Sequence, residues 1–260
     1  MELKDTTAIV TGGARGIGRG IALELARAGA NVVVADLPAL QDDIDATVAA
    51  IEAEGAQAAS VHCDVTKEAE VKAMVAAAIE RFGHVEILVN NAGVIGVAPV
   101  VMMSEEEWDR VLDVNLKGTF LCSKAVAAHM IERRSGRIIN LSSQAGKRGA
   151  PGVAHYCTSK WGVIGFTQSL ALELAGSNIT VNAVCPGEVD SKMWRDTLLP
   201  ALAAGQGTDP EAAWQAWIKE RVPLGRPQTA EDIGQAVVFL CRAENITGES
   251  INVTGGSEMG

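Results

Sequence analysis

The only tyrosine in this 260-residue chain, Tyr156, is followed four residues later by Lys160. The surrounding stretch, residues 153–175, has the composition of a long helix, so side chains four residues apart share a face. A neighbouring positive charge favours the phenolate form of a tyrosine. Lowering a tyrosine pKa from about 10 to about 7 takes roughly 4 kcal/mol, about what two unit charges 4 Å apart supply at an effective dielectric constant near 20. Lys160, helped by a second positive charge, would therefore make Tyr156 a general base at neutral pH.

A second polar residue, Asn115, stands where the pattern calls for an apolar one. Ser104 and Glu107 have the spacing of a capping box, which predicts that a helix begins there. The apolar stripe of this helix continues along the chain to the position of Asn115. A buried amide without partners costs about 1–3 kcal/mol. Asn115 is therefore predicted to have hydrogen-bond partners, either in the protein framework or in a functional site.

A glycine-rich turn near the start of the chain predicts a nucleotide site. Gly12, Gly16 and Gly18 lie between an apolar run and a helical segment, although not in GxGxxG spacing. Such glycines allow a tight turn and bring the backbone close to a pyrophosphate at a helix N-terminus. Asp36 ends the next apolar run, where an acid can bond the adenosine ribose and repel a 2′-phosphate, although it could also simply cap the next helix. Arg15 would attract that phosphate, but we give Asp36 more weight and predict NAD rather than NADP.

Strands and helices must alternate to hold these residues. Short apolar runs rich in β-branched residues are separated by segments of helical periodicity, which predicts a parallel sheet covered on both faces. We therefore expect an α/β fold, a single doubly wound Rossmann-type domain over residues 1–260 with a seven-stranded parallel sheet. The predicted strands are residues 7–10, 31–36, 58–64, 86–91, 136–142, 179–186 and 250–256.

One stretch, between Pro186 and Pro227, interrupts this alternation. It contains three of the five tryptophans and is too long for an ordinary connection. Because it follows a strand at the end of the sheet that binds ligands, we predict a substrate-binding lid at about residues 188–226. Alternatively, this stretch is not a lid but a surface segment that Trp214 and Trp217 merely anchor to the domain.

Composition excludes several classes of protein. A net charge of −10 argues against a nucleic-acid partner. The one basic cluster, Arg133, Arg134 and Arg137, suits the end of a helix that stops at Gly136. The five cysteines form no CxxC pair and the four histidines lack ligand spacing, so we expect free thiols and no metal. Without a signal peptide or a membrane-length apolar run, we expect a soluble, cytoplasmic protein.

Several short motifs occur in a fixed order along almost the whole chain. They are "TGGARGIG", Asp64 in "CDV", "NNAG" at residues 90–93, Asn115, Ser143 at the end of "LSS", the Tyr156–Lys160 pair and "PG" at residues 186–187. Together they resemble the short-chain dehydrogenase/reductase family.

The resemblance implies a role for each catalytic candidate. Tyr156 would be the acid/base, and Ser143 would hold the substrate oxygen, while Ser142 would satisfy backbone groups at the strand end. Lys160 would bind the nicotinamide ribose and shift the pKa of Tyr156. Asn115 would hold a water that relays protons from Lys160 to solvent.

The resemblance also implies a reaction and a cofactor site. The substrate hydroxyl would give its proton to Tyr156 while its carbon passes hydride to NAD. Asp64 and Val65 would hold the adenine, and Pro186 would flank the nicotinamide. The full set of implied cofactor-binding residues is Gly12, Arg15, Gly16, Ile17, Gly18, Asp36, Asp64, Val65, Asn91, Gly93, Tyr156, Lys160, Pro186, Gly187, Val189 and Ser191.

The substrate side resembles family members that act on vicinal diols, α-hydroxyketones and sugar alcohols. This likeness lies in "SSQAG" and "PGEVDSKMW". Gln144 would bond a second substrate oxygen or, alternatively, be a solvated loop residue. His155 would add a contact at the rim, and Trp194 would line the substrate site. The acidic residues Glu188 and Asp190 disfavour anionic substrates.

Other functions stay open at this point. A reductase of 3-oxoacyl groups or other bulky ketones is the alternative within the family, and a non-catalytic nucleotide-sensing protein is the alternative outside enzymes. The long helices around Phe120 and Phe166 resemble those that pack between subunits, which implies a homotetramer.

Overall fold

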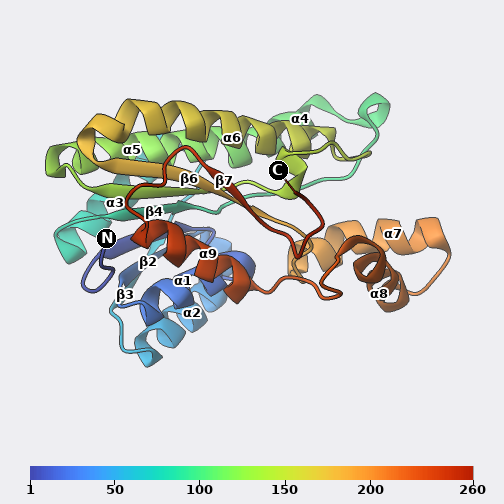
Figure 1. Cartoon of the computed structure of the whole chain (residues 1–260), viewed down its shortest axis with the longest axis horizontal. Coiled ribbons are helices and arrows are strands. Elements are labelled where there is room, and N and C mark those ends of the chain that lie inside the picture. Colours follow the sequence, from blue (N-terminus) through green and yellow to red (C-terminus); the bar gives the residue numbers. More distant parts are fainter. Residues whose placement is uncertain (260) are drawn as a thin grey trace.

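Seven parallel strands form one sheet in the computed structural model, which describes residues 1–259 (Figure 1). Their order is β3-β2-β1-β4-β5-β6-β7, so the direction of winding reverses between β1 and β4. In such sheets ligands bind outside the carboxyl ends of the strands at this reversal. The strands are β1 (Thr7–Thr11), β2 (Asn31–Asp36), β3 (Ala58–His62), β4 (Ile87–Asn90), β5 (Gly136–Leu141), β6 (Ile179–Pro186) and β7 (Ser250–Val253).

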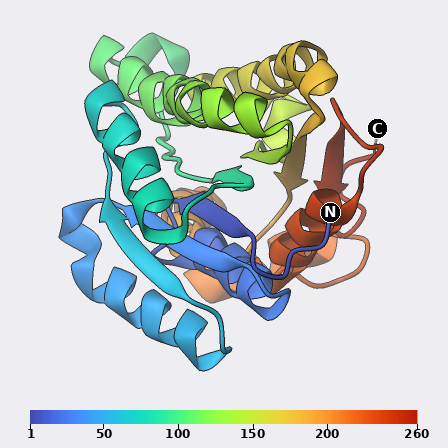
Figure 2. The same cartoon turned by 90° about the vertical axis from the view of Figure 1, so that its left-hand side faces the viewer.

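Helices cover both faces of the sheet, as the alternation of patterns predicts. One face carries α1 (Gly16–Arg27), α2 (Gln41–Ala53) and α9 (Ala230–Arg242). The other carries α3 (Glu68–Phe82), α5 (Gly118–Arg133) and α6 (Ala154–Leu174), with α4 (Glu105–Leu112) beside α6. In Figure 2 the sheet separates the blue and red helices from the green and yellow ones. The doubly wound α/β fold is therefore confirmed.

The first and last helices, α1 and α9, pack closely against each other. A Cβ atom on Gly20 would lie 2.5 Å from the Cβ of Ala230, and one on Gly234 would lie 2.6 Å from the Cγ of Glu24. Glycine at both places lets the two backbones approach. The apolar sides of the two helices share one core cluster, whose members include Ile21, Leu25, Ile233, Val237 and Leu240.

Asn115 lies in a π-helical turn, Asp113–Lys117, between α4 and α5. The predicted helix start is confirmed, because the Ser104 hydroxyl accepts a hydrogen bond of 3.2 Å from the backbone N–H of Glu107. The sequence pattern did not indicate the π-turn itself. Single π-turns inside helices occur often at functional sites.

The prediction that a helix stops at Gly136 is wrong. α5 ends at Arg133, and Arg134 itself takes the left-handed conformation, with φ of 52°. Gly136 instead begins β5, where a side chain would collide with Met130. Arg137 is buried, and its Nε donates to the carbonyl of Cys241 over 3.1 Å. The basic residues therefore do not form one exposed patch.

The stretch between Pro186 and Pro227, called the excursion from here on, leaves the carboxyl end of β6 and returns to α9. It consists of a π-turn, Trp194–Leu198, and the helices α7 (Leu199–Gln206) and α8 (Pro210–Arg221), which stand apart on the right of Figure 1. These elements have an apolar core of their own, in which the Trp194 ring lies 4.8 Å from that of Trp214 and 5.7 Å from that of Trp217. Whether this segment acts as a lid stays a prediction.

Candidate functional site

The residues with predicted chemistry meet at the carboxyl end of the sheet. The glycine-rich turn follows β1, Asn91 follows β4, Ser143 follows β5 and Gly187 follows β6. The first part of α6 brings Tyr156 and Lys160 to the same end, where Nζ of Lys160 donates to the carbonyl of Leu141, the last residue of β5. Residues from five segments, far apart in the sequence, are thereby placed around one site.

Tyr156 and Lys160 share a face of α6, and the Nζ of Lys160 is 5.7 Å from the centroid of the tyrosine ring. Lys160 is 5% exposed, and its Nζ donates to the carbonyl of Leu141 over 2.7 Å. Burial lowers the pKa of Lys160 to about 8. Burial also raises the pKa of Tyr156 to about 12, although a hydrogen bond with Ser143 opposes this rise. Lys160 without a second positive charge therefore does not bring the pKa of Tyr156 toward 7.

The structure distinguishes the two adjacent serines. The Ser142 hydroxyl is buried and donates to the backbone carbonyl of Lys160 over 2.8 Å. Ser143 is only half-buried, and its side chain acts to lower the pKa of the Tyr156 phenol. It also accepts a bond of 3.1 Å from the N–H of Ala145. Ser143 and Tyr156 therefore present a pair of hydroxyls that could share one substrate oxygen.

The Asn115 side chain is fully used within the protein. Its Oδ1 accepts from the N–H of Val94 over 2.8 Å, and its Nδ2 donates to the Val94 carbonyl over 2.9 Å and to the Ser159 hydroxyl over 3.0 Å. A Cβ on Gly93 would lie 3.3 Å from Oδ1 of Asn115 and 3.7 Å from Nζ of Lys160. Asn115 therefore holds the loop at residues 93–95 beside Lys160, and its role in a water relay stays a prediction.

Close backbone packing shapes the glycine-rich turn. Gly12 and Gly16 have left-handed φ values of 62° and 55°, which glycine adopts without strain. A Cβ on Gly18 would collide with the carbonyl oxygen of Gly12. The Nδ2 of Asn91 donates to the carbonyls of Thr11 and Gly12 over 2.9 and 3.0 Å, so Asn91 supports this turn.

The start of α1 fits a pyrophosphate. Its N-cap residue, Arg15, makes no side-chain hydrogen bond to the helix, and the first turn, which includes Ile17, carries no acidic residue. Nothing lies within 4 Å of a Cβ built on Gly16, so the turn opens outward there. Free N–H groups at a helix N-terminus are suited to phosphate oxygens.

Asp36 belongs to the same turn. Its Oδ2 accepts from the N–H of Ala14 over 3.0 Å and its Oδ1 from the N–H of Leu37 over 2.9 Å, and no side chain caps the helical turn that follows. The helix-cap alternative is therefore wrong. The Arg15 guanidinium lies 4.0 Å from the Asp43 carboxylate, so the cation that would attract a 2′-phosphate already has an acidic neighbour.

The adenine candidates lie in the loop after β3. The carboxylate of Asp64 accepts from the N–H and hydroxyl of Thr66 over 3.0 and 2.7 Å and lies 3.4 Å from the Lys67 ammonium. Burial acts to raise the pKa of Asp64, but these groups together hold it below its ordinary value. Val65 is buried against Gly118, where a Cβ would come within 2.7 Å of its side chain.

The segment after β6 is held in place by β7 and by the chain beyond the excursion. Pro186 ends β6, and the N–H of Gly187 donates to the carbonyl of Val253 over 3.0 Å. A Cβ on Gly187 would lie 2.7 Å from the Gln228 side chain, and Val189 pairs with Gln228 in an isolated parallel bridge. The predicted nicotinamide side is therefore a rigid, closely packed wall.

The structure contradicts the prediction for one substrate candidate, His155, and leaves that for Trp194 open. His155 is 0% exposed, and its Nε2 is 3.4 Å from the Glu107 carboxylate, so the predicted contact at the rim is wrong. The reason is the helical position of His155, which turns its ring toward α4 instead of the site. Trp194 is half-buried against the core of the excursion, and its backbone N–H donates to the Ser191 hydroxyl over 3.3 Å, so its place in the substrate site stays a prediction.

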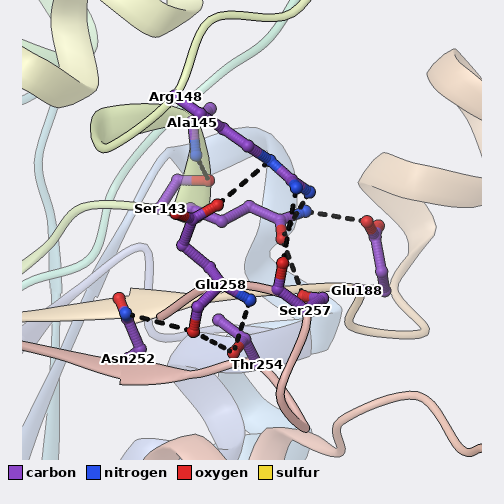
Figure 3. Close-up of polar contacts among 9 residues, drawn as sticks. Ser143, Ala145, Arg148, Glu188, Asn252, Thr254, Ser257 and Glu258 are labelled. Carbon is purple, nitrogen blue, oxygen red and sulfur yellow. Dashed lines mark hydrogen bonds and ion pairs between the residues drawn. The ribbon is translucent and has the colours of Figure 1, made fainter. Parts of the chain in front are cut away.

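Gln144 is half-buried, and its side chain is hydrogen bonded to three other residues. Its Nε2 donates to Oε1 of Glu188 over 2.7 Å, and its Oε1 accepts from Arg148 over 3.1 Å and from the Ser257 hydroxyl over 3.0 Å. Figure 3 shows this network beside Ser143, with the Glu258 carboxylate joined to Arg148. Sequence reasoning missed Arg148 and the C-terminal residues, because nothing in their spacing connects them with Gln144.

Metal ligands and membrane helices do not appear in the described residues. Among residues 1–259 no group of three or more His, Cys, Asp or Glu side chains is arranged to hold a metal ion. No helix within this range is both long and apolar enough to cross a bilayer. All five cysteines are buried free thiols, as predicted.

Known proteins are similar to this chain over most or all of its length. The family model described as short chain dehydrogenase matches residues 6–199. A galactitol 2-dehydrogenase from Agrobacterium fabrum is 42% identical over 262 aligned residues, covering 100% of both chains. The 3-oxoacyl-[acyl-carrier-protein] reductase FabG of Staphylococcus epidermidis is also 42% identical, over 97% of this chain and 99% of its own.

Solved structures are also similar to this chain over almost its whole length. NAD+-bound xylitol dehydrogenase superposes with a TM-score of 0.92 at 33% identity, over 98% of this chain and 100% of its own. A variant of actinorhodin polyketide ketoreductase with NADPH superposes with a TM-score of 0.92 at 38% identity, over 97% of each chain.

Proposed function

Because the chain belongs to the short-chain dehydrogenase family of oxidoreductases, we propose that it transfers hydride between NAD(H) and a secondary alcohol or the corresponding ketone. The proposed substrate is a small polyol, a sugar alcohol or a vicinal diol. The observation that carries this proposal is the pair of hydroxyls on Ser143 and Tyr156 beside the buried ammonium of Lys160. This arrangement, at the end of the sheet that also holds the glycine-rich turn, suits proton transfer at a carbon that gains or loses hydride.

Acidic side chains around the ribose position support NAD. Asp36 stands beside the turn, and the first turn of α2 carries Asp42 and Asp43, the latter close to Arg15. A 2′-phosphate would bring negative charge into this group of carboxylates. The likeness to an NAD+-bound xylitol dehydrogenase also supports this choice, whereas the ketoreductase with NADPH points the other way.

The chain's own residues perform the proton chemistry. In the oxidative direction, Oη of Tyr156 takes the proton of the substrate hydroxyl while Oγ of Ser143 holds the substrate oxygen. The bound oxidised nicotinamide supplies the hydride acceptor and a positive charge near Tyr156. Lys160 keeps its ammonium beside the phenol, so the positive charge it provides favours the phenolate. Reduction of a ketone uses the same groups in reverse.

The substrate side favours a neutral, oxygen-rich molecule. Gln144 directly follows Ser143, and the buried carboxylate of Glu188 lies behind it. A carboxylate near the pocket disfavours anionic substrates. Galactitol 2-dehydrogenase and xylitol dehydrogenase, which resemble this chain, act on sugar alcohols by their names.

A 3-oxoacyl or other bulky-ketone reductase is the second candidate. The observation in its favour is that FabG matches this chain at the same 42% identity as the galactitol enzyme. Asp36 disfavours the phosphorylated cofactor of the ketoreductase that also resembles the chain. A non-catalytic nucleotide-sensing protein would be expected to lack one of Asn115, Ser143, Tyr156 and Lys160, and all four are present.

The test is nicotinamide reduction by the purified protein with NAD and NADP side by side. The panel contains vicinal diols, sugar alcohols and simple secondary alcohols, with Tyr156→Phe as the blank. Activity with NAD on the polyhydroxy compounds supports the proposal. Activity only with NADPH on 3-oxoacyl thioesters would replace it with the second candidate, and NADH binding without any turnover would favour the sensing protein.

We also propose a homotetramer located in the cytoplasm. Phe120 on α5 and Trp161 and Leu172 on α6 are exposed apolar side chains, at 44%, 53% and 84%, and such residues suit a contact between copies. Light scattering of the purified protein measures its mass directly, and a monomer would rule out the tetramer. Free buried thiols suit a reducing compartment, which cell fractionation tests.

A further inference from the structure

The side-chain amide of Gln144 has only one chemically consistent orientation. Its Oε1 faces two donors, the Arg148 guanidinium and the Ser257 hydroxyl, and its Nε2 faces a carboxylate oxygen of Glu188. If the amide were turned over, its NH₂ group would face those donors and its carbonyl would face the carboxylate. A primary amide nitrogen carries two hydrogens, so one remains after the bond to Glu188. Gln144 can therefore offer a donor, but its acceptor is already used.

Arg148 connects this amide to the C-terminal segment. Its NH2 donates to Gln144, its NH1 lies 3.4 Å from the carbonyl oxygen of Ser257, and its Nε lies 3.3 Å from the Glu258 carboxylate. Arg148 therefore contacts both the Gln144 amide and the C-terminal segment (Figure 3). A guanidinium held at several nitrogens has little freedom to rotate, which fixes the donor that it points at Gln144.

The segment at residues 254–258 is itself anchored. The Thr254 hydroxyl donates to the carbonyl of Glu258 over 3.2 Å and accepts from its N–H over 3.3 Å, which closes a turn. Gly255 and Gly256 take left-handed φ values of 62° and 93° within this turn. The carbonyl of Gly255 accepts from the N–H of Leu224 over 3.1 Å, at the end of the excursion. The support for Gln144 therefore reaches the base of the predicted lid.

We infer that Arg148 and residues 254–258 are positioning elements that hold Gln144 so that its free N–H meets a second oxygen, on the substrate carbon next to the reacting one. This inference rests on the proposed function. It adds that the enzyme recognises the second oxygen as a hydrogen-bond acceptor, so vicinal diols and α-hydroxyketones both qualify and a simple secondary alcohol does not. Glu188, at 2% exposed, acts through Gln144 and does not touch the substrate.

The experiment compares 2,3-butanediol with 2-butanol, which differ by one oxygen, in the full-length enzyme with saturating NAD. The variants are Arg148→Met, Glu258→Gln and the two combined. Arg27→Met is the matched control, since Arg27 is a similarly exposed arginine whose partners Glu24 and Glu54 lie on a different part of the surface. Thermal unfolding of each variant checks that the fold persists.

We expect the wild-type enzyme to favour the diol, and Arg148→Met and Glu258→Gln to lower kcat/KM for the diol by about tenfold, mainly through KM. The value for 2-butanol should change by no more than about twofold. The double variant should lose no more than Arg148→Met alone, because both changes break the same connection. Arg27→Met should change neither substrate.

Equal losses on both substrates would make the network merely structural and overturn the inference, as would an unchanged preference for the diol. A wild-type enzyme that oxidises the two alcohols equally well would also overturn it while leaving the proposed oxidoreductase intact. A wild-type protein that binds NADH but oxidises no alcohol of the wider panel overturns the proposed function and this inference together.

Discussion

Burying the Lys160 ammonium should cost stability in a way that pH reveals. Burial lowers its pKa from an ordinary value of 10.5 to about 8. Between these values the unfolded chain holds the proton and the folded chain does not, so the free energy of unfolding rises with pH there. Below pH 8 both states hold the proton, and the cost of burying the charge is present in full. The perturbation that removes this dependence is Lys160→Met.

The size of the effect follows from the two pKa values. At 1.36 kcal/mol per pH unit, the difference between 10.5 and about 8 gives roughly 3 kcal/mol in total. Between pH 7 and pH 9.5 the wild-type side chain should recover about 2 kcal/mol of this. Methionine cannot titrate, so a variant that carries it lacks this part of the slope. The lost hydrogen bond to Leu141 is the same at both pH values and drops out of the comparison.

Urea unfolding of the cofactor-free protein at pH 7 and pH 9.5 measures this difference. Both proteins should carry Tyr156→Phe, because the phenol, with a pKa of 10.0 in the unfolded chain and about 12 in the folded one, otherwise adds its own pH dependence near pH 9.5. The free energy of unfolding of Tyr156→Phe, relative to that of the double variant, should rise by about 2 kcal/mol between the two pH values. A difference that stays constant within about 0.5 kcal/mol would refute the argument that burial controls the charge of Lys160.

Further predictions concern activity and the lid. Tyr156→Phe should abolish turnover and leave NADH binding, measured by fluorescence, almost unchanged; normal turnover would remove the tyrosine mechanism. Asp36→Ala should raise the ratio of kcat/KM for NADP over NAD by about tenfold or more, because a charge that repels the 2′-phosphate is lost, and an unchanged ratio would mean that the ribose is recognised elsewhere. Gln144→Ala should lower kcat/KM for diols about tenfold more than for simple secondary alcohols, and equal losses in the same assay would contradict the second-oxygen contact. The Trp214 side chain is 2% exposed, so Trp214→Ala should lower the stability of the excursion by about 3–5 kcal/mol. Proteolysis at residues 194–221 should then be faster while the sheet stays folded. Resistance to the protease equal to that of the wild type would show that the excursion has no core of its own.

The sequence predicted the fold well, because its signals are local. Each strand is a short apolar run and each helix has its own periodicity, so the alternation of the two determines a doubly wound sheet. Strand positions agree with the prediction to within a few residues, as at β3, which ends at His62 and not at residue 64. The Ser142 hydroxyl bonds the backbone carbonyl of Lys160, and the role of Ser143 at the substrate oxygen stays a prediction.

Contacts between distant segments were not predictable in this way. Arg148 and Ser257 are more than a hundred residues apart, and only the folded chain brings both to Gln144. The position of His155 was not predictable either, because consecutive residues of a helix point in different directions. The sequence carries no measure of burial, which here raises the pKa of Tyr156 to about 12 in the cofactor-free chain.

The contact between α1 and α9 has a consequence for biosynthesis. α1 forms the N-terminal end of the nucleotide site, yet its apolar face packs on Ile233, Val237 and Leu240, near the other end of the chain. While the protein is being translated, the glycine-rich turn and α1 emerge first and must wait for α9 before that face is covered. The cofactor site is therefore finished only after α9 has been synthesised. A nascent chain stalled before residue 230 would expose an apolar helix, which makes it a target for chaperones.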